Sequence, residues 1–124
     1  MDLKEFYEAM AMKDKLLQIV NYYEIKNQLK YFQSEIFELN EAIIQYEMAK
    51  DDNKERIIKD GKPRWNMDYY KEHITEEVAD VMVMLGQIKY YYDLNKSKIT
   101  KIMNYKIDRQ LKRIEEEKVE SGVS

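Results

Sequence analysis

Apolar residues recur along most of this chain at intervals of three and four positions, the repeat of an α-helix with one apolar face. The repeat predicts four helices, over about residues 2–23, 24–50, 68–93 and 97–118. The first helix is expected to break near residues 11–13. In the second helix the apolar repeat consists of Leu29, Phe32, Ile36, Leu39 and Ile43, and in the third of Ile74, Val78, Val81, Leu85, Ile88 and Tyr92.

One substantial connection is expected between the second and third helices, over residues 51–67. It contains several charged residues, Gly61, and Pro63, which is the one proline of the chain. Ser97 is expected to cap the last helix. Since tight strand turns consume Gly and Pro, and this chain has three glycines, the pattern predicts an all-α fold of the four-helix-bundle type. Residues 1–118 would form a single domain and residues 119–124 a disordered tail.

Composition excludes several classes of protein. The formal net charge of −3 lacks the excess of cations that a general binder of nucleic-acid polymers needs. Cysteine is absent, which removes disulfides, thiolate zinc sites and cysteine nucleophiles. The longest uncharged runs are too short to cross a bilayer, and the first residues lack the pattern of a signal peptide. A cytoplasmic protein with no membrane partner is expected.

Two pairs of acidic residues flank the apolar repeats. Glu35 and Glu38 in the second helix and Glu77 and Asp80 in the third are each spaced i,i+3, so each pair shares one helix face. Carboxylates at the edge of a core-facing stripe need cations, and four of them on two facing helices favour a hard divalent ion such as Mg²⁺. The alternative is that these are ordinary surface acids of solvated helix flanks.

In the fourth helix, cations occupy positions at which the apolar repeat predicts leucine. Lys106, Arg109 and Arg113 continue a line that starts with Ile99 and Ile102. Together with the acidic pairs they favour a site with a metal on one side and phosphate oxygens on the other. The alternative is that long cationic side chains extend to solvent from a partly buried helix.

These segments resemble the MazG-like all-α nucleoside triphosphate pyrophosphohydrolases. Residues 34–43, with the order E-x-x-E, resemble the first acidic helix of the family, and residues 76–85, with E-x-x-D, resemble the second. Lys106-Ile107-Asp108-Arg109, followed by Arg113, resembles the basic segment of the family's last core helix. The resemblance covers about residues 19–114, although the stretch between the acidic motifs is longer here than is common in the family.

The resemblance implies hydrolysis of a ribo- or deoxyribonucleoside triphosphate between the α and β phosphates, giving the monophosphate and pyrophosphate. Glu35, Glu38, Glu77 and Asp80 would hold Mg²⁺, with Mn²⁺ as a substitute. The catalytic residues would be Glu38, as one candidate to orient water, and Lys106 and Arg109, which would stabilise the leaving pyrophosphate. Arg113 would assist in binding the substrate. A homodimer or a dimer of dimers is expected, since Phe37, Ile44 and Met48 lie outside the main stripe.

Further residues are candidates for contact with the nucleobase. Trp65 could stack on the base and Asn66 could bond to it, if the 51–67 loop closes over the nucleotide. The alternative for Trp65 is a hydrophobic plug that closes the loop onto the bundle. Gln28 is a weaker candidate, and His73 is expected at the surface or in a cap.

Two other functions remain open at the level of sequence. One is a protein of the same type that binds nucleotides without hydrolysing them. The other is a helical protein-interaction module whose charged stripes select a partner.

Overall fold

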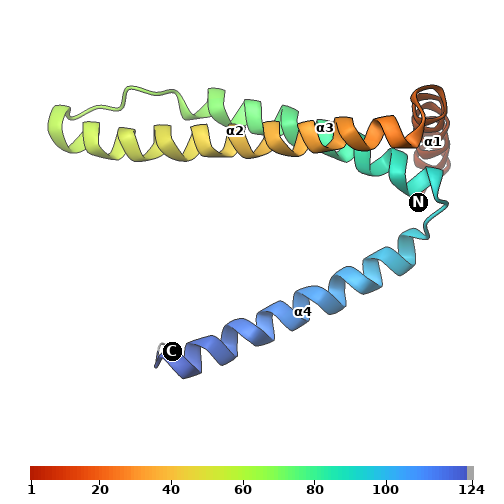
Figure 1. The fold of residues 1–124 in the computed structure, drawn as a ribbon. Coiled ribbons are helices and arrows are strands. Elements are labelled where there is room, and N and C mark those ends of the chain that lie inside the picture. The colour runs from red at the N-terminus through yellow and green to blue at the C-terminus, as the bar shows by residue number, and fades with distance from the viewer. Residues whose placement is uncertain (123–124) are drawn as a thin grey trace. The chain divides into compact units, whose positions relative to one another are not determined.

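The computed structural model describes residues 1–122, and these fold into helices without a strand (Figure 1). The prediction of an all-α fold is confirmed. The chain forms two compact units, Met1–Tyr92 and Asp93–Ser124, which are described separately. The expectation of a single domain stays a prediction. The helices are α1 Leu3–Tyr23, α2 Ile25–Asp60, α3 Met67–Tyr91 and α4 Lys96–Ser121.

Local capping fixes where the helices begin and end. The side chain of Asn66 accepts a hydrogen bond from the N–H of Asp68 and caps α3, while Asn95 accepts one from the N–H of Lys98 and caps α4. The prediction that Ser97 caps the last helix was therefore wrong by two residues. At the end of α2, Gly61 adopts a left-handed conformation with φ of 77°, and its N–H bonds to the carbonyl of Ile57.

The long loop expected over residues 51–67 is mostly helix. α2 continues to Asp60, so the connection consists of residues 61–66 alone. The stretch from Asp51 to Asp60 is highly charged but contains no Gly or Pro, and Lys, Glu and Arg favour helix. Arg56 also pairs with Asp52 one turn earlier, at 2.7 Å. The break expected near residues 11–13 is absent as well, because α1 is continuous.

α2 and α3 form a long antiparallel hairpin and pack along each other (Figure 1). The buried or half-buried positions of α2 alternate in steps of four and three residues, the spacing of a coiled-coil seam. Two alanines, Ala42 and Ala49, let the helices approach closely in the middle of this seam. The same inner line, however, contains four polar or charged side chains: Gln28, Glu35, Asn53 and Arg56.

Part of the apolar stripe expected to be the core lies on one flank of the hairpin, whereas Phe32 and Leu39 are half-buried in the seam. Leu29, Ile36 and Ile43 are 45%, 38% and 41% exposed. On α3, Val78 and Leu85 are also exposed. At about 100° per residue in two antiparallel helices, these five side chains fall on the same side of the hairpin. The chain therefore presents an apolar flank, defined as Leu29, Ile36, Ile43, Val78 and Leu85.

α1 crosses the hairpin steeply at the end away from the loop, where Figure 1 shows it nearly end-on. It packs mainly on α3 and buries Leu16 and Val20. A Cβ built on Gly86 of α3 would lie 2.8 Å from Cδ1 of Leu16. The absence of a side chain at Gly86 thus allows the close packing of α1 on α3.

α4 forms the second unit and none of its described residues is buried. Its apolar positions form one stripe, bordered on one side by Lys106, Arg109 and Arg113 at about 100° per residue. Residues 96–114 contain seven Lys and Arg and one Asp, a formal charge of +6, whereas residues 1–92 carry −5. The helix extends to Ser121, into the segment expected to be a tail, of which residues 123–124 lie outside the described part. Across residues 1–122, no helix has the length and apolar character to span a membrane.

Candidate functional site

The hairpin brings the acidic residues of α2 and α3 into one cluster. Carboxylate oxygens of Glu35, Glu77 and Asp80 all lie within 4.8 Å of one another. Glu38, one turn after Glu35, is near enough for its charge to repel those of both Glu35 and Glu77. The structure therefore assembles in space the four carboxylates that the sequence places in two separate pairs.

The register of the hairpin explains why these residues meet. Nε2 of Gln28 donates a hydrogen bond to Oε1 of Gln87 across the hairpin at 2.8 Å. Glu35 lies seven residues after Gln28, and Asp80 lies seven residues before Gln87. Seven residues make about two helical turns and return to the same face of a helix. Since α2 and α3 are antiparallel, seven residues forward on α2 and seven back on α3 bring Glu35 opposite Asp80. This register sets Glu38 opposite Glu77 in the same way.

The cluster is short of positive partners. Glu77 is 9% exposed, and Oε2 of Glu35 and Oε2 of Glu77 are buried without any hydrogen-bond partner among the described residues. Burial, followed by repulsion from Asp80 and Glu38, raises the pKa of Glu35 above its ordinary 4.5. Burial, followed by repulsion from Glu38 and Asp80, raises the pKa of Glu77 as well. Carboxylates that destabilise one another in this way are suited to a cation.

The chemistry of the donors fits a hard divalent metal. Oxygen atoms of carboxylates are the ligands that Mg²⁺ and Mn²⁺ prefer, and no sulfur or imidazole ligand is within the cluster. The two orphaned oxygens, on Glu35 and Glu77, offer lone pairs that no residue in the described range 1–122 uses. The geometry of Glu35, Glu77 and Asp80 is compatible with such an ion, and Glu38 lies beside them.

His73 lies at the edge of the cluster and received no functional role from the sequence. It is half-buried on α3, one turn before Glu77, with Nδ1 3.9 Å from a carboxylate oxygen of Glu76. Its proximity lowers the pKa of Glu77, opposing the effects of burial and of the other acids. The expectation of a surface position fits its 43% exposed side chain, but the nearby acids give it an electrostatic effect.

The candidates for base contact have other partners. Gln28 is buried and bonded to Gln87, so its expected role in substrate binding is corrected to a role in the core of the hairpin. The oxygen of Asn66 is engaged in capping α3. The indole N–H of Trp65 donates to Oδ2 of Asp52 at 2.6 Å. Trp65 is therefore fixed against the end of α2 and is not part of a long closing loop.

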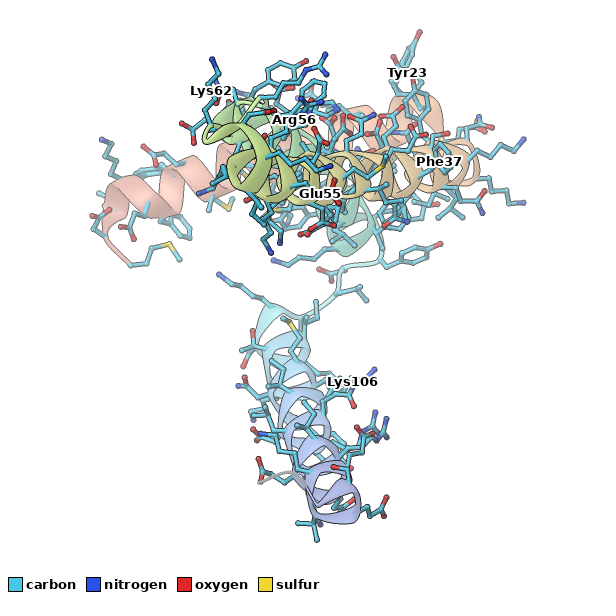
Figure 2. The ribbon with its side chains drawn as sticks, turned by 90° about the vertical axis from the view of Figure 1, so that its left-hand side faces the viewer. Tyr23, Phe37, Glu55, Arg56, Lys62 and Lys106 are labelled. Carbon is cyan, nitrogen blue, oxygen red and sulfur yellow. The ribbon has the colours of Figure 1, made fainter. Side chains whose placement is uncertain are left out.

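Asn53 organises the short loop around Trp65. This residue is 7% exposed, and its side-chain oxygen accepts hydrogen bonds from the N–H groups of Arg64 and Trp65. Its side-chain nitrogen donates to the carbonyl of Trp65 at 2.9 Å. Figure 2 shows Arg56 and Lys62 at this end of the hairpin. In the sequence Asn53 is one polar residue within a charged segment, so nothing there indicates that it anchors a loop.

The predicted cations lie on α4. Lys106, labelled in Figure 2, and Arg109 and Arg113 are exposed side chains of the second unit. The guanidinium of Arg109 lies 5.8 Å from the ring centroid of Tyr105. The role of these cations toward phosphate stays a prediction.

No protein-family model, curated protein or solved structure matches this chain.

Proposed function

We propose that this protein is a divalent-metal-dependent nucleoside triphosphate pyrophosphohydrolase of the MazG-like type, which converts a ribo- or deoxyribonucleoside triphosphate into the monophosphate and pyrophosphate. The observation that carries the proposal is the pair of buried, unbonded carboxylate oxygens on Glu35 and Glu77 in a cluster of four acids. A protein stabilises such a cluster by binding a cation, since unpaired buried charge is costly. The order of the acidic motifs supports the choice of reaction.

In this proposal Glu35, Glu38, Glu77 and Asp80 hold Mg²⁺, or Mn²⁺ in its place. The bound metal supplies neutralisation of the phosphate charge and a lower pKa for the attacking water. Glu38 is the more accessible carboxylate of the α2 pair and orients the water, since it is exposed to solvent and lies close to the buried acids. Carboxylates of neighbouring residues, Glu41 and Glu76, are the other candidates for this role.

We further propose that the cations of α4 act on the phosphates. Lys106 and Arg109 would stabilise the negative charge that develops on the leaving pyrophosphate, and Arg113 would assist in binding it. A guanidinium can bind two phosphate oxygens at once, whereas an ammonium acts as a compact point charge. The formal charge of +6 over residues 96–114 supports a role toward a polyanion.

The proposed assembly is a homodimer or a dimer of dimers. The apolar flank of the hairpin, defined above, leaves five branched aliphatic side chains between 38% and 50% exposed. A contiguous apolar surface of this kind is typical of an interface. Mass measurement by light scattering tests this assembly, and a monomer at micromolar concentration contradicts it.

The experiment that tests the reaction is pyrophosphate release from ribo- and deoxyribonucleoside triphosphates in the presence of Mg²⁺. Release from at least one substrate is expected in the wild type and not in Asp80→Asn. Binding without release from any substrate would instead favour a nucleotide sensor, and neither binding nor release would favour an interaction module.

A further inference from the structure

An open groove of about 500 Å³ lies at the loop end of the hairpin. Its walls combine aromatic and aliphatic side chains with a few polar groups, which is the usual make-up of a small-molecule site of this size. Its lining includes Gln45, Met48, Asp52, Arg56, Trp65 and Tyr70.

The groove continues the face of the hairpin on which the acidic cluster opens. Glu38, Gln45 and Asp52 are spaced seven residues apart on α2, so their side chains lie in one line along the helix. At about 1.5 Å per residue, Gln45 lies roughly 10 Å from Glu38 along the axis. On α3, Tyr70 lies seven residues before Glu77 and is separated from it by the same distance. The near end of the groove is thus separated from the carboxylates by a distance comparable to the length of one ribose with one phosphate.

The aromatic wall of the groove is held rigidly. Oδ2 of Asp52 accepts hydrogen bonds from the indole N–H of Trp65 at 2.6 Å and from Nε of Arg56 at 2.7 Å. These two bonds lower the pKa of Asp52, the one from Arg56 being the larger cause. Tyr70 meets Trp65 edge to face, with ring centroids 6.3 Å apart, and the guanidinium of Arg64 lies 4.6 Å from the Trp65 ring. A flat ring entering this groove meets preorganised aromatic surfaces.

The groove also contains polar groups that can hydrogen-bond to the edge of a ring. Within the described chain, the amide of Gln45 makes no hydrogen bond and Arg56 uses only its Nε. An amide both donates and accepts, so it can pair with the edge of any nucleobase. Asp52, Arg56 and Arg64 together carry a formal charge of +1, which tolerates a ligand with an anionic substituent.

We propose that this groove is the nucleobase subsite of the hydrolase, with Gln45 bonding to the base and Tyr70 and Trp65 forming its aromatic walls. The inference rests on the proposed function and extends it. It requires the substrate to carry a nucleobase, which excludes bare polyphosphates. Gln45 and Tyr70 then become specificity-determining residues. The occupant is a ring, because aromatic side chains line the groove and its near end lies roughly 10 Å along the helix from Glu38.

The first test uses the one tryptophan of the chain as a probe within the groove. Its emission is followed at the red edge of tryptophan absorption, where the eleven tyrosines contribute little, in buffer with EDTA and no Mg²⁺. The four common nucleoside 5′-monophosphates are the ligands, and ribose 5-phosphate is the control without a base. Saturable quenching by at least one nucleotide and none by ribose 5-phosphate is expected, because stacking needs the ring. Absence of quenching by all four nucleotides would overturn the proposal.

The second test measures steady-state kinetics of pyrophosphate release. Gln45→Ala and Tyr70→Leu should each raise KM about tenfold and change kcat less than about twofold, as expected when ground-state and transition-state binding are lost equally. Gln33→Ala is the matched control, since Gln33 is an exposed glutamine of α2 on another face. Unchanged KM in both groove variants would overturn the subsite and leave the proposed reaction intact.

Variants of Trp65 distinguish a side chain that contacts the base from a hydrophobic plug that only closes the loop onto the helices. Trp65→Phe keeps an aromatic wall and should retain KM within about threefold, whereas Trp65→Ala should raise KM several-fold and flatten the preference among bases. If Trp65→Ala lowers only the melting temperature and leaves base preference unchanged, Trp65 is a plug and the assignment is wrong. Nucleotide quenching in a wild type that releases no pyrophosphate would support the subsite and refute the reaction. The two proposals therefore fail independently.

Discussion

Gln28 and Gln87 are hydrogen-bonded to each other in the interior of the α2–α3 hairpin, with 2.8 Å between Nε2 and Oε1. They are 8% and 2% exposed, and Nε2 of Gln87 donates a hydrogen bond to the sulfur of Met84, with 3.5 Å between the two atoms. A buried polar pair of this kind favours one register of two helices, since any slip would leave both amides without partners. The acidic cluster lies two turns farther along the same register.

Replacing one amide of this pair should cost more than replacing both. Gln28→Leu leaves the amide of Gln87 buried without its partner, and we expect a loss of about 1–3 kcal/mol in the free energy of unfolding. The double variant Gln28→Leu/Gln87→Leu should recover part of that loss. A double-mutant cycle by urea unfolding measures the coupling. Additive single effects would contradict the importance of the pair.

Removing one carboxylate from the cluster should abolish activity without harming the fold. Asp80→Asn weakens metal binding and also relieves repulsion toward Glu35 and Glu77, so the metal-free variant should be as stable as the wild type or slightly more stable. Pyrophosphate release over a range of Mg²⁺ and thermal unfolding in EDTA measure the two effects. Full activity at limiting Mg²⁺ would contradict the assignment of Asp80 as a ligand. The corresponding control on an exposed acid of α2, Glu47→Gln, should change neither quantity much.

The stability of the metal-free protein should fall as the pH rises through the range in which the cluster ionises. The folded-state pKa values of Glu35 and Glu77 lie above the ordinary 4.5 of the unfolded chain, so the folded protein binds protons more tightly. The destabilising contribution is absent below about pH 4.5 and complete above the raised pKa values. Thermal unfolding in EDTA should show Glu35→Gln more stable than the wild type at neutral pH. This difference should shrink toward pH 4.5, and saturating Mg²⁺ at neutral pH should abolish or reverse it. A difference independent of pH would contradict the prediction.

Asn53 should be essential for the loop that positions Trp65. Asn53→Ala removes three hydrogen bonds to the backbone of Arg64 and Trp65, and we expect a loss of about 2–3 kcal/mol. The emission of Trp65 should shift to the red as the indole becomes more exposed. Asn40→Ala, an exposed asparagine of the same helix, is the control and should have little effect. Retention of both stability and emission in Asn53→Ala would contradict the role of this residue.

The sequence predicts the class of the fold, the two pairs of acids and the apolar part of the inner face, such as Phe32 and Leu39, but not the polar members of that face. The repeat of apolar residues assigns Leu29, Ile36 and Ile43 to the core, because hydrophobicity alone gives no reason to bury glutamine or glutamate. In the structure the inner line includes Gln28 and Glu35, whose burial depends on partners from α3. Such pairings are tertiary and have no counterpart in a single helix.

The length of the loop could not be read from charge. Charge together with Gly61 and Pro63 favours a connection over residues 51–67, with no more than a short turn of helix at residues 57–58. In the structure Asp52 and Arg56 pair one turn apart within a continuous helix, and the side chain of Asn53 accepts hydrogen bonds from the loop. The left-handed Gly61 marks the true end of α2. The groove beside Trp65 exists only because the helix continues this far, so no sequence pattern could indicate it.

The uneven distribution of charge between the two units has a consequence for how the protein behaves in solution. Residues 1–92 carry −5 and residues 96–114 carry +6, and the remaining residues, 93–95 and 115–124, carry −4, which brings the whole chain to −3. Copies of the chain therefore attract one another through unlike segments even where their net charges repel, most strongly in dilute buffer. At about 0.1 M salt the Debye length is about 10 Å, which screens most of this attraction. The protein should bind both anion- and cation-exchange resins at low salt, and its purification should start at moderate ionic strength.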